Sequence, residues 1–114
     1  MAKFQQGRHT PAFILLFLQD RPAYGGQLLQ RLDEELPFNP IDSASLYRTL
    51  KQLEANGDVH SEWVQEGGDK PVKWYTITQH GRKTLALFHE DIRLRAENLA
   101  FFLRTYQGTD GETH

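Results

Sequence analysis

The sequence predicts a mostly α-helical domain with one small β-hairpin and a long final helix. Over most of the 114 residues, apolar side chains recur at three- and four-residue steps, the period of a helix with one buried face. The stretch around Gly67-Gly68 is the exception, because β-branched and aromatic residues stand on both sides of it, as in a hairpin. No proline follows Pro71, so nothing in the pattern interrupts a long last helix.

The composition is that of a globular protein, with 39% hydrophobic and 25% charged residues. The chain has no cysteine, which excludes disulfides, thiolate zinc sites and cysteine nucleophiles. Its longest apolar run, 12–18, is much shorter than the roughly 20 residues that cross a bilayer. The first residues lack the apolar segment of a signal peptide. We therefore expect a cytoplasmic protein with no membrane partner.

Two helices are expected in the first third of the chain. Thr10 and Pro11 suit a helix start, with Thr10 as the N-cap, and the apolar run behind them predicts a largely buried helix. That helix should end before Pro22, because the residue preceding a proline is pushed out of the helical region. A second helix follows Gly25-Gly26, since leucines at four-residue spacing in 28–36 form one apolar stripe before Pro37.

A third helix and the hairpin follow. Asp42 can cap the helix, and Asn56-Gly57 can end it in a left-handed turn. The strands are expected on either side of the loop 65–71, and the alternation along them indicates that Trp63, Trp74 or both pack in the core against the third helix.

The final helix is predicted to carry an oligomer interface. Its apolar residues form a heptad-like seam that protrudes beyond a small core, and such a stripe usually meets another helix. The expected interface residues are Leu85, Phe88, Ile92, Leu99, Phe102 and Tyr106. We therefore divide the chain into a domain over 8–78, a dimerisation helix over 79–107 and a flexible tail over 108–114.

Three helices, a two-stranded hairpin and a long helix follow the order of a winged helix-turn-helix with an added C-terminal helix. In such a module the third helix can enter the major groove of double-stranded DNA, which is about 12 Å wide. Short polar and cationic side chains there suit base edges and phosphates, as do cations in the wing. The candidate residues are Ser43, Ser45, Tyr47, Arg48 and Lys51 on the helix, and Lys70, Pro71 and Lys73 on the wing.

The same residues support a family resemblance. The chain resembles the short branch of the PadR family of bacterial transcriptional regulators, from about Pro11 to the end of the last helix. The residues that carry the resemblance are Tyr24-Gly25, Leu28-Leu29, Leu46-Tyr47-Arg48-Thr49-Leu50-Lys51-Gln52-Leu53-Glu54, Gly57, Gly67-Gly68, Lys70-Pro71, Lys73-Trp74-Tyr75-Thr76-Ile77-Thr78 and Gly81. The chain departs from the family pattern at Asp58, where leucine is common, and this change is expected to loosen the packing between the third helix and the first strand of the hairpin.

The resemblance implies a homodimeric repressor that binds an inverted-repeat operator in its own promoter or in that of a neighbouring gene. It also implies that small aromatic or cationic-lipophilic compounds, or signals of another kind, relieve repression. For a ligand pocket between subunits, composition and resemblance single out the aromatic residues Phe13, Phe17, Phe88 and Phe101, with Phe102 beside them.

The charge leaves a second hypothesis open. The net charge of −2 lacks the basic surplus typical of a nucleic-acid-binding domain, although residues 1–31 carry four cations against Asp20 alone. Acids near the wing favour a winged-helix protein-interaction module that does not bind DNA directly. These acids are Asp58, Glu62, Glu66 and Asp69.

Enzyme chemistry is not expected. The sequence has no phosphate-binding glycine loop and no nucleophile elbow, so a small enzyme in a dimer cavity is the weakest alternative. Its five histidines form no pair at metal-ligand spacing, so we expect no metal and no cofactor.

Overall fold

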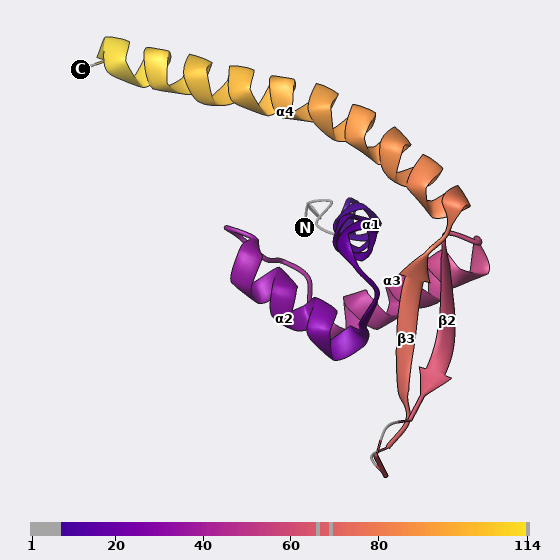
Figure 1. Cartoon of the computed structure of the whole chain (residues 1–114). Coiled ribbons are helices and arrows are strands. Elements are labelled where there is room, and N and C mark those ends of the chain that lie inside the picture. Colours follow the sequence, from indigo (N-terminus) through magenta and orange to yellow (C-terminus); the bar gives the residue numbers. More distant parts are fainter. Residues whose placement is uncertain (1–7, 66, 69, 114) are drawn as a thin grey trace.

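The computed structural model describes residues 8–65, 67–68 and 70–113 (Figure 1). These residues form four helices and a small antiparallel sheet, which confirms the expected fold class of a winged helix-turn-helix followed by a long helix. In chain order the elements are α1 (Thr10–Asp20), β1 (Ala23–Tyr24), α2 (Gly25–Glu35), α3 (Ser43–Ala55), β2 (Val59–Val64), β3 (Val72–Ile77) and α4 (Gln79–Thr113).

The core is built around α1, which packs against α3, α4 and β3. Ile14, Leu15 and Leu18 of α1 are almost fully buried, as expected for a helix that is apolar nearly all round. They meet the inward leucines of α2 and α3 in one cluster. The predicted cap is shifted by one residue: His9 is the N-cap, and Thr10 is instead a buried residue of the first turn.

The ends of α3 are as expected from the sequence. The Asp42 carboxylate accepts a hydrogen bond from the Ser45 amide at 2.8 Å and so caps the helix. At the other end, Gly57 has φ +82°, a left-handed conformation that glycine adopts without the strain of a side chain. The recognition-helix candidate is therefore short and bounded at both ends.

The sheet has a third strand that the sequence did not predict. β1 pairs with β3 through only two residues, Ala23 with Tyr75 and Tyr24 with Trp74, giving the order β1-β3-β2. A strand of two residues shows no alternation, so its pairing is visible only in three dimensions. It joins the start of α2 directly to the wing.

The expectation of a tryptophan in the core is wrong. Trp63 is 68% exposed, and Trp74 is half-buried against the ring of Tyr24, with centroids 5.3 Å apart. Tyr75 is buried instead, because alternation puts it on the inner face of β3 and puts Trp74 on the other face. Trp63 does share the inner face, but it stands near the free end of the hairpin, opposite Lys73.

A tight junction joins the start of α4 to the turn between α3 and β2. The Thr78 hydroxyl donates to the Gly57 carbonyl at 2.6 Å and accepts from the Gly81 amide at 3.0 Å. The Thr78 amide donates to the carbonyl of Asp58. Gly81 lies so close to that carbonyl that a Cβ atom would overlap it. Asp58 is buried rather than a source of loose packing, since its carboxylate accepts from the Thr84 hydroxyl at 2.6 Å.

Beyond this junction, α4 arches past α1 and projects from the domain (Figure 1). The radius of gyration is 17.6 Å, against about 13 Å for a compact chain of this length. The helix continues past its expected end at Gln107, and its backbone is helical to Thr113. No proline follows Pro71, so the backbone hydrogen bonds run on without a break. Within the described residues, no helix is long and apolar enough to span a membrane.

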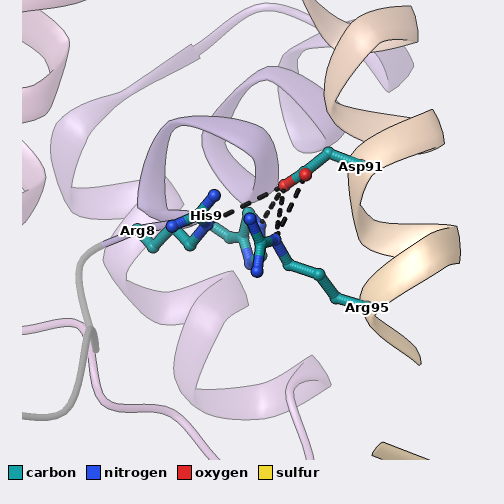
Figure 2. Close-up of polar contacts among 4 residues, drawn as sticks. All are labelled: Arg8, His9, Asp91 and Arg95. Atoms are coloured by element: carbon teal, nitrogen blue, oxygen red, sulfur yellow. Dashed lines mark hydrogen bonds and ion pairs between the residues drawn. The ribbon is translucent and has the colours of Figure 1, made fainter. Parts of the chain in front are cut away.

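A polar cluster fastens α4 to the start of α1 (Figure 2). The carboxylate of Asp91 accepts a hydrogen bond from Nε2 of His9 at 3.0 Å and two from Nε of Arg95 at 3.1 Å. Arg8 lies 3.8 Å from the same carboxylate. The His9 ring also meets Phe88 edge to face. These bonds favour the charged carboxylate and hold the pKa of Asp91 below its ordinary value, chiefly through His9.

We predict that Gly81→Ala destabilises the protein by roughly 1–3 kcal/mol, because the added methyl group must push α4 away from the Asp58 carbonyl. Gly108→Ala is the matched control, since Gly108 lies in the same helix with nothing within 4 Å. There the methyl group should raise stability by about 0.5–1 kcal/mol through helix propensity. Urea denaturation of both variants measures the effects, and equal stability of the two would contradict the tight junction.

We predict that Asp91→Asn destabilises the protein at neutral pH and that this loss fades in acid. A carboxylate with a lowered pKa stabilises the fold at pH values above its ordinary pKa of 3.8. That contribution disappears as the pH falls through the lower pKa of the folded state, where wild type and variant should converge. Urea denaturation at neutral pH and at several values below 3.8 measures the difference. The control is Glu62→Gln, at an exposed position with no ion pair among the described residues. Its stability should equal that of the wild type at every pH.

Candidate nucleic-acid interface

The outer face of α3 presents two cations between two small residues. Ala44, Arg48, Lys51 and Ala55 are all exposed and follow one another at three- and four-residue steps, so they lie on one line along the helix. The buried leucines of α3 point to the opposite side, into the core. The alanines at the ends of the line leave room for close approach, and the cations stand between them.

The two serines at the start of α3 differ in exposure. Ser43 is exposed, whereas Ser45 is half-buried and its hydroxyl accepts a hydrogen bond from the Arg48 guanidinium at 3.3 Å. Asp42, a carboxylate at the same end, is engaged in the cap. The hydrogen bond from the Ser45 amide lowers the pKa of Asp42, so this acid is charged at neutral pH while it serves the helix.

Tyr47 lies on the flank of α3 that faces the wing. Its side chain is exposed to 47%, and its ring covers Gly25, where any Cβ atom would collide with the ring. The start of α2 and the recognition-helix candidate are therefore in direct contact through this tyrosine. Sequence reasoning took Tyr24-Gly25 only as a mark of resemblance, and the close approach explains why a residue without a side chain stands there.

The three wing candidates do not share one environment. Lys70 and Pro71 are exposed beside the turn, whereas Lys73 is turned inward. Its Nζ lies 3.6 Å from the carboxylate of Glu54 and 5.8 Å from the ring centroids of both Trp63 and Tyr75. The acids Glu66 and Asp69, which belong to the protein-interaction hypothesis, lie outside the described residues.

Glu54 links the wing to α3 and was missed by the sequence analysis. Its carboxylate accepts a hydrogen bond from the Ser61 hydroxyl of β2 at 2.6 Å and pairs with Lys73 of β3. Both strands are thus fastened to the same residue of the helix. Between wing, α3 and the start of α2 lies an aromatic groove of about 420 Å³, lined mainly by Tyr24, Tyr47, Trp63, Pro71 and Tyr75.

The net charge of −2 does not show how the charges are distributed over the molecule. Several cations pair with carboxylates on other elements, as with Arg31 and Glu35 of α2 at 2.8 Å or Arg93 and Glu97 of α4 at 2.7 Å. Among the described residues, neither Arg48 nor Lys51 has a carboxylate within ion-pair distance. Six of the described acids pair with a lysine or an arginine, and all of these ion pairs except that of Glu54 with Lys73 lie away from α3.

The four aromatic residues considered for a ligand pocket do not meet within one chain. Phe17 is a core residue, buried under the Arg31 guanidinium at 4.3 Å, and Phe13 packs against the same core. Phe101 is exposed far along α4. Phe88 borders a cavity, together with residues of α3. No three histidine, aspartate or glutamate side chains gather as a metal site in the described part of the chain.

The seam expected on α4 is divided into two parts. Leu85, Phe88 and Ile92 are half-buried against the chain's own domain. The later seam residues are exposed, and so are several of their neighbours. The exposed large apolar side chains of this part are Leu94, Leu99, Phe101, Phe102, Leu103 and Tyr106.

A capped helix with outward cations, a wing fastened to it and a projecting helix together define a winged helix-turn-helix protein. The Transcriptional regulator PadR-like family matches residues 14–87, and the chain belongs to this family. No curated protein matches the sequence.

Solved structures agree with this assignment. A PadR family transcriptional regulator from Eggerthella lenta DSM 2243 is 29% identical, with a TM-score of 0.72 over 86% of this chain and 84% of that one. Bacillus subtilis PadR in complex with operator DNA is 26% identical, with a TM-score of 0.67 over 71% of this chain and 46% of that one. The circadian clock associated protein Pex from anabaena is 30% identical, with a TM-score of 0.62 over 82% of this chain and 84% of that one.

Proposed function

We propose that this protein is a homodimeric transcriptional repressor that binds an inverted-repeat operator in double-stranded DNA, in its own promoter or a neighbouring one. The observation that carries the proposal is the outer face of α3, where Arg48 and Lys51 stand exposed with no carboxylate within ion-pair distance among the described residues. The similarity to Bacillus subtilis PadR, which was solved with operator DNA, supports the same conclusion.

In this proposal α3 lies in the major groove and reads one half-site. Ala44 and Ser43 allow the start of the helix to approach base edges, while Arg48 and Lys51 bond phosphates on the groove walls. The Tyr47 hydroxyl adds a phosphate contact beside the start of α2. The negative charge of Asp42 at this end is offset in part by the Ser45 amide, from which its carboxylate accepts a hydrogen bond, and by Arg48.

The wing contributes to DNA binding mainly through the residues near its turn. Lys70 and Pro71 are exposed and can reach a flanking phosphate or the minor groove. Lys73 has a different role in this proposal, since its ammonium group pairs with Glu54 and holds the wing on α3. We therefore propose that Lys73 orients the wing and that Lys70 contacts DNA.

The dimer is assigned to the exposed part of α4. At 100° per residue, the exposed apolar side chains from Leu94 to Tyr106 span an arc of about 200°. One packed helix covers an arc of only about 100°, so two helices are needed to bury this surface. A second copy of the chain supplies two such helices, its α4 and its α1. Leu16 of α1 is 49% exposed. A two-fold dimer then presents two α3 helices about 34 Å apart, one turn of DNA.

Repression follows from occupancy, because a dimer bound across a promoter covers DNA that a polymerase needs. Relief by a small aromatic or lipophilic effector completes the proposal. Its support is the mostly apolar cavity between α3 and α4, where a bound molecule would touch both the DNA-reading helix and the dimer helix.

We predict that Arg48→Ala and Lys51→Ala each weaken binding to every duplex and reduce the slope of log affinity against log salt by about one unit. Fluorescence anisotropy with the promoter duplex upstream of the protein's own gene, titrated at two salt concentrations, measures both quantities. Arg93→Ala is the control, since this cation is paired with Glu90 and Glu97 on α4 and should leave the slope unchanged. An unchanged slope in both α3 variants would place the DNA surface elsewhere.

We predict that Phe102→Asp converts the dimer into a monomer and lowers operator affinity by on the order of tenfold or more, because one half-site is then bound at a time. Sedimentation equilibrium should give twice 13.2 kDa for the wild type and one such mass for the variant. Ala100→Asp introduces the same charge outside the apolar arc and should stay dimeric. A wild type that sediments as a monomer would refute the assigned interface.

A further inference from the structure

The indole of Trp63 is 68% exposed, although it belongs neither to the core nor to the proposed dimer surface on α4. It stands on β2 opposite Lys73, on the face of the hairpin that also carries Ser61 and Tyr75. That face is turned toward α3, since the Ser61 hydroxyl donates to Glu54 of that helix. Tryptophan is enriched where one molecule binds another, so an exposed indole beside α3 indicates a contact with a partner.

Lys73 connects this indole to α3. Its Nζ lies over the Trp63 ring, 5.8 Å from the centroid, and 3.6 Å from the carboxylate of Glu54. An ammonium group over the face of an indole is attracted by the negative charge of that face. The ring is therefore held in a defined place relative to α3 before any partner binds, which reduces the entropy lost on binding.

The aromatic groove between the wing, α3 and the start of α2 combines apolar faces with hydrogen-bond donors. Trp63 lines it from the wing, Tyr47 from α3 and Tyr24 from the start of α2. The phenol hydroxyls and the Lys73 ammonium are donors, and no acid is among the described residues that line the groove. Its lining suits an occupant that carries both a negative charge and a small apolar ring.

The two DNA-binding elements of the proposed function lie on either side of this groove. There, α3 occupies the major groove and the turn of the wing reaches the adjacent minor groove. The hairpin extends past α3, so its turn stands well away from the helix (Figure 1). Adjacent grooves of a duplex are separated by one sugar–phosphate backbone. That backbone must cross the protein between α3 and the wing, where the aromatic groove lies.

We propose that the aromatic groove holds one strand of the DNA and that the Trp63 indole stacks on a deoxyribose of that strand. This inference rests on the proposed function, because it requires α3 in the major groove. The C–H face of the sugar packs on the indole, while phosphates on either side accept hydrogen bonds from Tyr24 and Tyr47. Contacts to sugar and phosphate carry no base information, so Trp63 is a positioning residue that fixes where α3 lies along the strand.

Stacking on the sugar makes one position in each half-site selective for deoxyribose. The C2′ atom of deoxyribose carries only hydrogen, whereas a 2′-O-methyl group adds bulk and a polar oxygen against an apolar ring. The proposed contacts of Arg48 and Lys51 are made to phosphates, which are the same in both kinds of strand. A sugar modification thus separates the role of Trp63 from theirs.

The first experiment follows the exposure of Trp63 in Trp74→Phe, which has no other tryptophan. The promoter duplex upstream of the protein's own gene is added, its binding is measured by fluorescence anisotropy, and the indole is probed by acrylamide quenching. Bound duplex should lower the quenching constant about twofold or more, because stacking covers one face of the ring. Saturable binding with an unchanged quenching constant would overturn the inference and leave the repressor proposal standing.

The second experiment compares variants on the same duplex. Trp63→Ala should lower affinity about fivefold or more, the lower end of aromatic stacking on nucleic acid, and Trp63→Phe should restore most of it. The slope of log affinity against log salt should not change, because no charge is removed. Leu87→Ala is the control, since it removes an apolar side chain that is 74% exposed on α4. Full affinity of Trp63→Ala would contradict the stacked sugar.

The third experiment places a single 2′-O-methyl group at each position of a half-site in turn. The wild type should lose about fivefold or more in affinity at one position, and Trp63→Ala should show no such loss there. A variant with a merely displaced wing would still reject the modified sugar, so a loss that persists in Trp63→Ala would overturn the inference, as would a wild type that is sensitive at no position. A wild type that binds no duplex at all would overturn the repressor proposal as well.

Discussion

The contact between the start of α4 and the turn after α3 is the constraint on which the rest of the molecule depends. Gly57 turns the chain out of α3, and Thr78 returns it to the same place after the wing. Because Gly81 packs directly against the Asp58 carbonyl, this contact sets the direction in which α4 projects from the domain. The presentation of α3, the root of the wing and the course of the proposed dimer helix are all set within these few residues.

Two further polar links extend this constraint outward. Glu54 fastens both wing strands to α3, and Asp91 fastens α4 to the start of α1. Each link places an acid where it neutralises a cation of another element, and Arg48 and Lys51 are left on the outer face of α3 with no carboxylate within ion-pair distance among the described residues. A chain of net charge −2 can thus present a locally positive surface, because its acids are used in holding the elements together.

Most of the fold was predictable from the sequence, because its signals are local. Asp42, Gly57 and the leucine stripes mark helix ends and faces within a few residues of themselves. The pairing of β1, the inward turn of Lys73 and the role of Glu54 were not predictable, because each depends on a partner far along the chain. The tryptophan prediction failed for the same reason: alternation assigns a face, but only the position along the hairpin decides whether that face is covered.

The candidate site was predictable to a lesser degree. Exposure and spacing agree with Arg48 and Lys51 as outward cations, and those features can be read from a helical period. Which aromatic residues line a cavity could not be read in this way, since Phe17 is in the core and Phe101 lies far from it. The buried state of Asp58 was also out of reach, because an acid after a helix end is ordinarily exposed.

The length of α4 also has a geometric consequence. Glu54 joins the wing to α3, and the junction at Gly81 fixes the start of α4 against the turn after α3, so the angle of this junction sets where the far end of α4 lies. A helix of 35 residues is about 52 Å long. Over such a lever arm, a rotation of only about 4° displaces the far end by about 3.6 Å, close to the 3.4 Å rise of one base step along a DNA strand. A very small difference in angle at this junction therefore moves the far end of α4 by about the rise of one base pair.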